Sequence, residues 1–183
     1  MGKDRTHKEL ADFARLVVRA GYLNRARTSA EVGNFVRAEL DDDTGADELT
    51  ERLVAEAVAE LAAEQATWGE RTDNDALSEV LAELAERGFL TLEYCQDHVN
   101  VQAELRARPG VVGVVFFTET DVWHAVAEHR LELKVWHPDS TPVTEDDPEL
   151  AVVLDTLRRH GLSARLDDGQ VQLAITWRKR QLF

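Results

Sequence analysis

Gly113-Val114-Val115-Phe116-Phe117-Thr118-Glu119-Thr120-Asp121 is the stretch of sequence that decides the fold of this chain. Its first half, Gly113 to Phe117, is uncharged and rich in Val and Phe, which is typical of a strand buried on both faces of a sheet. Its second half is polar and precedes an apolar helical pattern, so a capped helix is predicted to begin near Thr118. A buried strand that leads into a capped helix indicates a sheet covered by helices.

On either side of this stretch, the two parts of the chain differ in the spacing of their apolar residues. Residues 1–70 carry apolar residues at helical spacing, with one helix predicted to begin at Thr28 or Ser29 and a break predicted at Asp41 to Gly45. After residue 71, helical patterns alternate with short strand patterns, and the last two strands, joined at Asp167 to Gly169, predict a hairpin. Arg130 to Trp136 alternates between polar and apolar residues, which predicts an edge strand or a strand buried on one face.

The order of these patterns predicts an α+β fold, or an α/β fold. A helical N-terminal segment, residues 1–70, is expected to pack with an α/β domain, residues 71–183, as one compact unit. The second part is expected to hold a mixed sheet of about five strands flanked by helices.

Composition narrows the classes of function. The formal net charge of −14 disfavours a nucleic-acid-binding face, which needs clustered Lys and Arg, but it permits a protein partner with a basic surface. The single cysteine, Cys95, excludes an intrachain disulfide and favours the cytoplasm. No apolar run is long enough to cross a membrane. The chain contains no Walker loop, GxSxG, HExxH or GxGxxG motif, and we expect no cofactor. The oligomeric state stays open.

Polar residues at the end of the buried strand are the leading candidates for a site, because α/β folds place sites at the carboxyl ends of strands. We expect Thr118, Glu119 and Asp121, with Tyr94 from the preceding strand, to bind a ligand hydroxyl or ammonium group. The alternative is that the same residues only cap a helix, since Thr and Asp are favoured there. A third hypothesis is a hydrolase-type enzyme that uses Asp121 and Glu119 with a histidine.

Cys95 and His98 are weak candidates for metal ligands. They could supply two ligands, with His124, His129 or His137 completing the set. The structural alternative is that Asp97 and His98 begin a helix. A Cys95 nucleophile with His98 as its base lacks a third, orienting group.

Several segments together resemble a bacterial, mainly actinobacterial, family that is known only as a domain of unknown function. The matching segments extend over most of the chain: Gln65 to Trp68, Thr72-Asp73 with Leu77, Leu84 and Gly88, Gly113 to Phe117 with Asp121, Leu131 to Trp136, Gly161-Leu162, Asp168-Gly169 and Thr176 to Arg180. Members of that family carry a Cys-Cys-x-x-Cys element where this chain has Tyr94-Cys95-Gln96-Asp97-His98, so the thiol chemistry that the element implies is not expected here.

We therefore expect a non-enzymatic protein- or ligand-binding module. A small-molecule enzyme and a metal-binding protein are the two alternatives.

Overall fold

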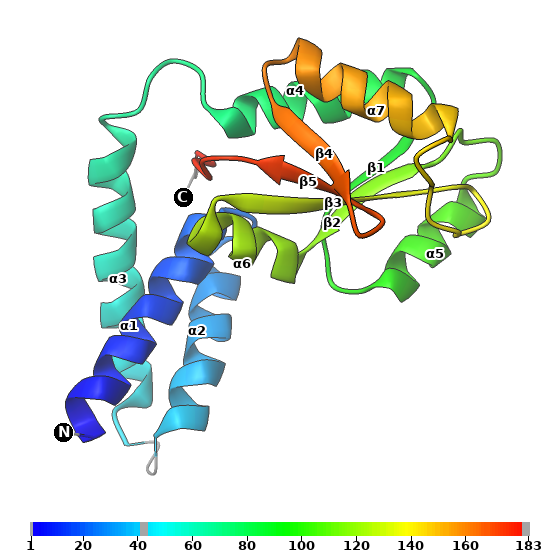
Figure 1. The fold of residues 1–183 in the computed structure, drawn as a ribbon. Coiled ribbons are helices and arrows are strands. Elements are labelled where there is room, and N and C mark those ends of the chain that lie inside the picture. The colour runs from blue at the N-terminus through cyan, green and yellow to red at the C-terminus, as the bar shows by residue number, and fades with distance from the viewer. Residues whose placement is uncertain (1, 41–43, 181–183) are drawn as a thin grey trace. The chain divides into compact units, whose positions relative to one another are not determined.

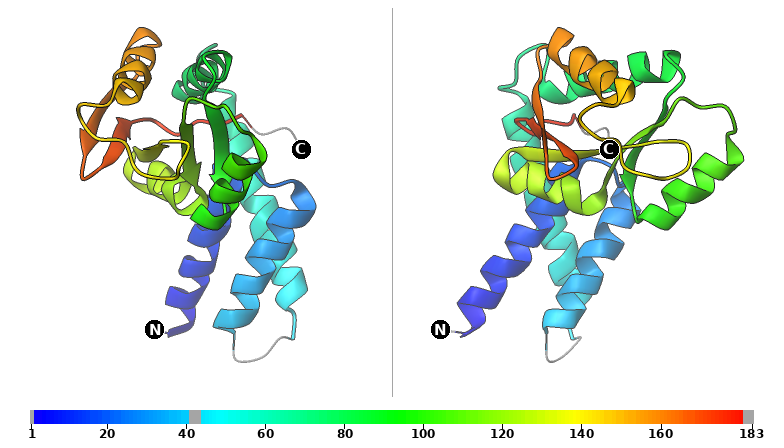
Figure 2. Two further views of the ribbon diagram at one scale, coloured as in Figure 1. Left: turned by 90° about the vertical axis from the view of Figure 1, so that its right-hand side faces the viewer. Right: turned by 45° about the vertical axis from the view of Figure 1, so that its right-hand side comes forward.

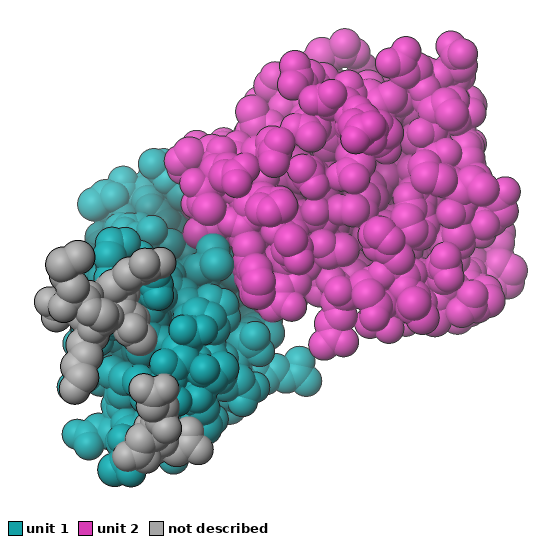
Figure 3. Space-filling model, turned by 60° about the horizontal axis from the view of Figure 1, so that its bottom comes forward, with its two compact units in different colours: residues 1–70, 178–183 teal, residues 71–177 magenta. Residues whose placement is uncertain are grey.

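The computed structural model describes residues 2–40 and 44–180. The chain forms two compact units (Figure 3), one built from Met1–Glu70 with Arg178–Phe183 and the other from Arg71–Trp177. None of the helices in the described ranges combines the length and the apolar character that crossing a membrane requires.

The first unit is a bundle of three helices, α1 (Gly2–Ala20), α2 (Arg25–Glu39) and α3 (Ala46–Gln65). The Asn24 side chain caps α2 by accepting a hydrogen bond from the Arg27 amide at 3.0 Å. The predicted start at Thr28 or Ser29 is therefore wrong, because the Asn24 side chain, further upstream, already accepts from one of the first free N–H groups of the helix. The predicted break overlaps residues 41–43, which lie outside the described part. The bundle core consists of apolar residues from all three helices: Leu10, Ala14, Val17, Val18, Val32, Val36, Ala46, Leu53, Val54, Ala57 and Leu61.

The C-terminal segment belongs to this helical unit. The Lys179 ammonium group lies 4.2 Å from the centre of the Tyr22 ring, a cation–π geometry. Arg180 Nη2 donates to the Gly69 carbonyl at 2.6 Å. Because these contacts join residues from opposite ends of the sequence, the bundle is discontinuous along the chain.

The second unit is a mixed sheet with helices on both faces (Figures 1 and 2). Its strands are β1 (Leu90–Cys95), β2 (Val114–Thr118), β3 (Arg130–Trp136), β4 (Ser163–Asp167) and β5 (Gln170–Ala174), in the order β1-β2-β3-β5-β4. Only β1 and β2 are parallel. Its helices are α4 (Asp73–Glu86), α5 (His98–Ala107), α6 (Glu119–Glu128) and α7 (Pro148–Arg159). The α+β prediction with about five strands is confirmed.

The central position in the sheet belongs to β3, which pairs with β2 on one side and β5 on the other. The prediction of an edge strand is therefore wrong, although Leu131, Leu133 and Val135 do share one fully covered face. On the opposite face Lys134 is buried as well, because a helix covers it. The alternation of polar and apolar residues predicted the strand correctly, but it could not predict which strands and helices would lie beside it.

The two faces of the sheet are covered by different helices. Figures 1 and 2 show α4 and α7 along one side of the sheet. Val101 and Leu105 of α5 pack on the other side, against Leu90, Val114 and Phe116. Asp121 at the beginning of α6 contacts Lys134, the register partner of Phe116, so α6 covers this side too.

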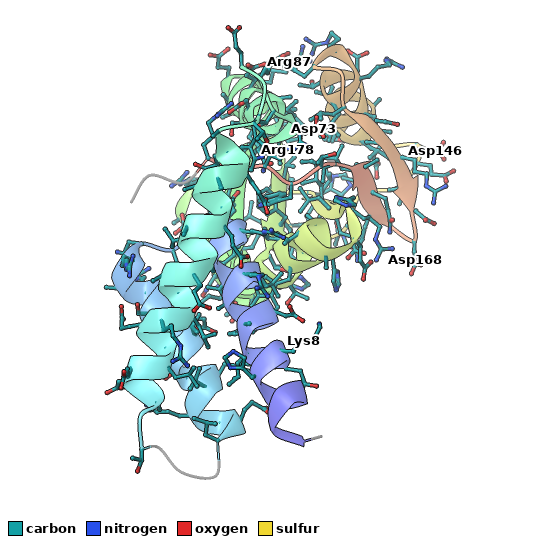
Figure 4. All side chains as sticks on the ribbon, turned by 90° about the vertical axis from the view of Figure 1, so that its left-hand side faces the viewer. Lys8, Asp73, Arg87, Asp146, Asp168 and Arg178 are labelled. Carbon is teal, nitrogen blue, oxygen red and sulfur yellow. The ribbon has the colours of Figure 1, made fainter. Side chains whose placement is uncertain are left out.

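Local chemistry fixes one turn and the start of one strand. Asp168 and Gly169 have φ values of 48° and 74°, as a two-residue hairpin turn requires, so the predicted hairpin is confirmed; Figure 4 labels Asp168 there. At Gly113 a Cβ atom would lie 2.8 Å from the Trp136 carbonyl oxygen. Glycine therefore allows β2 to begin close beside β3.

Candidate functional site

The predicted site residues gather at the carboxyl ends of β1 and β2. These two strands are parallel, and Cys95 at the end of β1 pairs in register with Thr118 at the end of β2. Parallel strands place their carboxyl ends at the same edge of a sheet, which brings Tyr94 and Cys95 beside the start of α6. The sequence proposed these residues separately, and the sheet places them in one neighbourhood.

Thr118 and Asp121 form a capping box at the beginning of α6. Thr118 Oγ1 accepts from the Asp121 amide at 3.4 Å, while Asp121 Oδ2 accepts from the Thr118 amide at 2.6 Å. The Thr118 hydroxyl also donates to Asp121 Oδ2 at 2.7 Å. These bonds satisfy N–H groups that a helix leaves without partners at its first turn. The structural role expected of both residues is thus present.

Lys134 completes this cluster, and sequence reasoning missed it. Its Nζ donates to Asp121 Oδ2 at 2.6 Å, and the side chains of Lys134 and Asp121 are only 10% and 4% exposed. A buried ion pair recovers the cost of removing both charges from water only when its geometry is good and further hydrogen bonds are present, as the capping box provides. The Asp121 oxygen therefore takes part in three hydrogen bonds, two from Thr118 and one from Lys134.

Tyr94 and Glu119 form a second contact at the same edge. The Tyr94 hydroxyl donates to Glu119 Oε1 at 2.6 Å. Tyr94 has a φ of 55°, in the left-handed region, and the register of β1 with β2 shifts between Leu92 and Cys95. Such irregular strand ends redirect side chains and are common beside functional sites. Here the irregularity coincides with the Tyr94 contact to α6.

The Cys95 thiol is protonated at neutral pH. Burial raises its pKa from 9.0 to about 11, assisted by the nearby carboxylates of Asp121, Asp97 and Glu104, while Lys134 opposes the shift. Because the thiolate is the nucleophilic form, this environment suppresses nucleophilic chemistry.

His98 lies at the beginning of α5, where the Asp97 side chain caps the helix as expected. Its ring meets the rings of Phe116 and Trp136 edge-on, with centroid distances of 5.7 and 5.0 Å. These contacts give His98 a packing role beside the candidate site.

The other histidines occupy separate positions. His124 lies on α6, His129 ends that helix with a φ of 58°, and His137 contacts Asp147 at 3.2 Å. Across residues 2–40 and 44–180, no three His, Cys, Asp or Glu side chains are grouped so that they could hold a metal ion.

Comparison with known proteins identified one family. A family model described as a domain of unknown function (DUF6891) matches residues 3–181. No curated protein and no solved structure matches the chain.

Proposed function

Because the chain belongs to the DUF6891 family of domains of unknown function, we propose a function from its geometry: a non-enzymatic module that binds a basic protein partner at the carboxyl ends of β1 and β2. The observation that carries this proposal is the Glu119 carboxylate, which is only partly buried and is positioned by the Tyr94 hydroxyl at 2.6 Å. A positioned, accessible carboxylate is an acceptor for Arg or Lys side chains.

The groups around Glu119 favour binding over catalysis. The Asp121 carboxylate accepts hydrogen bonds from Lys134 and Thr118, which supports a structural role for it. The Cys95 thiol, with its pKa raised to about 11, is not a nucleophile at neutral pH. The accessible group that remains at the carboxyl ends of β1 and β2 is the Glu119 carboxylate, which can accept hydrogen bonds.

The local charge favours a cationic partner. Asp97 and Glu104 lie close enough to Cys95 to help raise its pKa, which places further negative charge around this edge of the sheet. The chain as a whole carries a net charge of −14. Fields of this sign attract basic surfaces and speed their encounter with the protein.

The proposal is tested by fluorescence anisotropy with a labelled Arg-rich peptide and the full-length chain. We expect salt-sensitive binding that weakens about three- to tenfold in Glu119→Gln, because one charge-assisted contact is lost. Glu56→Gln is the matched control, since Glu56 is exposed on α3 of the other unit and the variant loses the same charge. Equal weakening in both variants, or no binding at low salt, would contradict the proposal.

A small-molecule enzyme that uses Glu119 with a histidine is the second candidate, favoured by one observation. The left-handed backbone of Tyr94, beside Glu119, is the kind of strain that accumulates at active sites. Assay of the purified chain against chromogenic esters and phosphate esters tests this candidate. It is abandoned if Glu119→Gln retains whatever turnover the wild-type chain shows.

We also infer a bacterial source and a cytoplasmic location, with no nucleic-acid ligand. The abundant Ala, Arg, Glu and Val, the single Cys95 and the acidic charge support these inferences. Fractionation of a bacterial host tests the location, and a DNA filter-binding assay of the purified chain tests the absence of a nucleic-acid ligand; export to the periplasm or retention of DNA would overturn the corresponding inference.

A further inference from the structure

A second feature of the α/β unit involves other residues, where β3, β5 and β4 run side by side near the end of α6 (Figure 1). A hollow of about 380 Å³ is present there. Pockets for small molecules begin at about this size, roughly 300 Å³. Its lining comes from the three strands and the residue that ends α6: His129, Arg130, Ser163, Ala164, Arg165, Gln172, Leu173 and Ala174.

The strand register explains why polar side chains collect in this hollow. Ser163 pairs with Ala174, which pairs with Arg130, and in the next row Arg165 pairs with Gln172. Side chains two residues apart on a strand share a face, so these five point to the same side of the sheet. The small Ala174 side chain lies between Ser163 and Arg130, which leaves room for the hollow.

The charge of this lining is opposite to that of the chain. It includes two arginines and a histidine but no carboxylate, in a chain that has 35 acidic and 21 basic residues. Ser163 and Gln172 add neutral hydrogen-bond donors. The hollow is therefore rich in hydrogen-bond donors, and Glu132, the register partner of Gln172, is the carboxylate that lies on the same face beside Arg130.

The arginines are held only loosely by their neighbours. Arg130 Nη2 lies 3.2 Å from Glu128 and 3.4 Å from Glu132, and Arg165 Nη2 lies 3.1 Å from Asp167. The Glu128 and Asp167 side chains are 56% and 49% exposed, so these two ion pairs contribute little and a ligand can replace them, whereas Glu132 is only 18% exposed and stays beside Arg130. In addition, Arg130 Nε is buried and has no acceptor within the described residues. A buried donor without a partner is uncommon and indicates a group that a ligand or water can satisfy.

We propose that this hollow binds a small anionic metabolite through a phosphate or carboxylate group. Two guanidinium groups can each donate two hydrogen bonds in a fork that matches either oxyanion. Ser163 and Gln172 supply the contacts that select the rest of the molecule. The ligand and the surface differ from those of the proposed basic partner, so each proposal can fail without the other.

The test is a titration of the isotopically labelled, full-length chain by NMR, with inorganic phosphate in one series and citrate in another. Chloride keeps the ionic strength constant, so general screening does not change. We expect saturable shifts of the amide signals of residues 163–165 and 172–174 with at least one anion. The anion that binds more tightly identifies the phosphate or the carboxylate class.

Three variants and a control make the result specific. Arg165→Gln and Arg130→Gln should each weaken binding about tenfold or more, because each removes a forked, charge-assisted contact. Arg165→Lys keeps the charge but loses the fork, and should recover only part of the affinity. Arg108→Gln is the control, because Arg108 is an exposed residue of the same unit that does not line the hollow and pairs with Glu104 at 3.5 Å. Absence of saturable shifts with both anions, or an equal loss in the Arg108 variant, overturns the proposal.

Discussion

Replacement of Lys134 by methionine should destabilise the α/β unit strongly. Methionine fills a similar volume but removes the positive charge beside Asp121, whose side chain is only 4% exposed. Breaking a buried ion pair by removing one partner typically costs about 3–5 kcal/mol, because the remaining charge is buried without compensation.

The structure indicates the lower end of that range. The Asp121 carboxylate keeps its two hydrogen bonds from Thr118, at 2.6 and 2.7 Å, after Lys134 is lost. We therefore expect a loss of about 3 kcal/mol, which is a large part of the 5–15 kcal/mol that a typical domain has in total.

Urea unfolding of the full-length chain, followed by tryptophan fluorescence and far-UV circular dichroism, measures this loss as a lower transition midpoint. The double variant Lys134→Met with Asp121→Asn should recover most of the stability, because asparagine carries no charge and its side-chain oxygen can still accept from Thr118. Lys8→Met is the control: Lys8, labelled in Figure 4, pairs with Asp12 on the exposed surface of α1, and its loss should cost less than about 0.5 kcal/mol. The reasoning is refuted if Lys134→Met costs less than about 1 kcal/mol, or if the double variant is no more stable than the single one.

Two further predictions concern titration. Because the pKa of Cys95 is raised from 9.0 to about 11, its thiol should be alkylated by iodoacetamide about a hundredfold more slowly than in urea-unfolded protein at pH 8. The contribution of this shift to the free energy of unfolding should be complete below pH 9 and lost as the pH rises through 11, and Cys95→Ser should lack this alkaline loss. Equal alkylation rates in the folded and the urea-unfolded protein would contradict the shift. Hydrogen bonds from Arg159 and His160 lower the pKa of Glu83 from 4.5 to about 2, so its contribution should be present above pH 4.5 and lost as the pH falls through 2. Thermal melts of wild type and Glu83→Gln should therefore converge at low pH, and a constant difference between them would count against this contribution.

The sequence predicts best what is decided locally. Thr118 and Asp121 stand three residues apart, so the capping box that begins α6 follows from their spacing alone. Asp168-Gly169 likewise specifies its turn, because both residues tolerate positive φ. Since these signals depend on a few neighbouring residues, they do not require knowledge of the sheet.

The missed features depend on which strands become neighbours. Lys134 looks like a solvent-facing residue of an alternating strand, and it is buried only because β3 lies between β2 and β5 with α6 over it. The Tyr94 contact with Glu119 needs the parallel pairing of β1 with β2 and the left-handed backbone at Tyr94. Arg130 and Arg165 are 35 positions apart in the sequence. They line the same hollow because β5 pairs with β3 on one side and with β4 on the other.

The discontinuous helical bundle has a consequence for the order in which the chain acquires structure during synthesis. All of Arg71–Trp177 emerges from the ribosome before Lys179 and Arg180 can reach Tyr22 and Gly69. Domains generally fold as units while synthesis proceeds, so the sheet can form first and the bundle is completed last. A ribosome that stalls just before Arg178 would thus hold a helical unit that still lacks its closing segment.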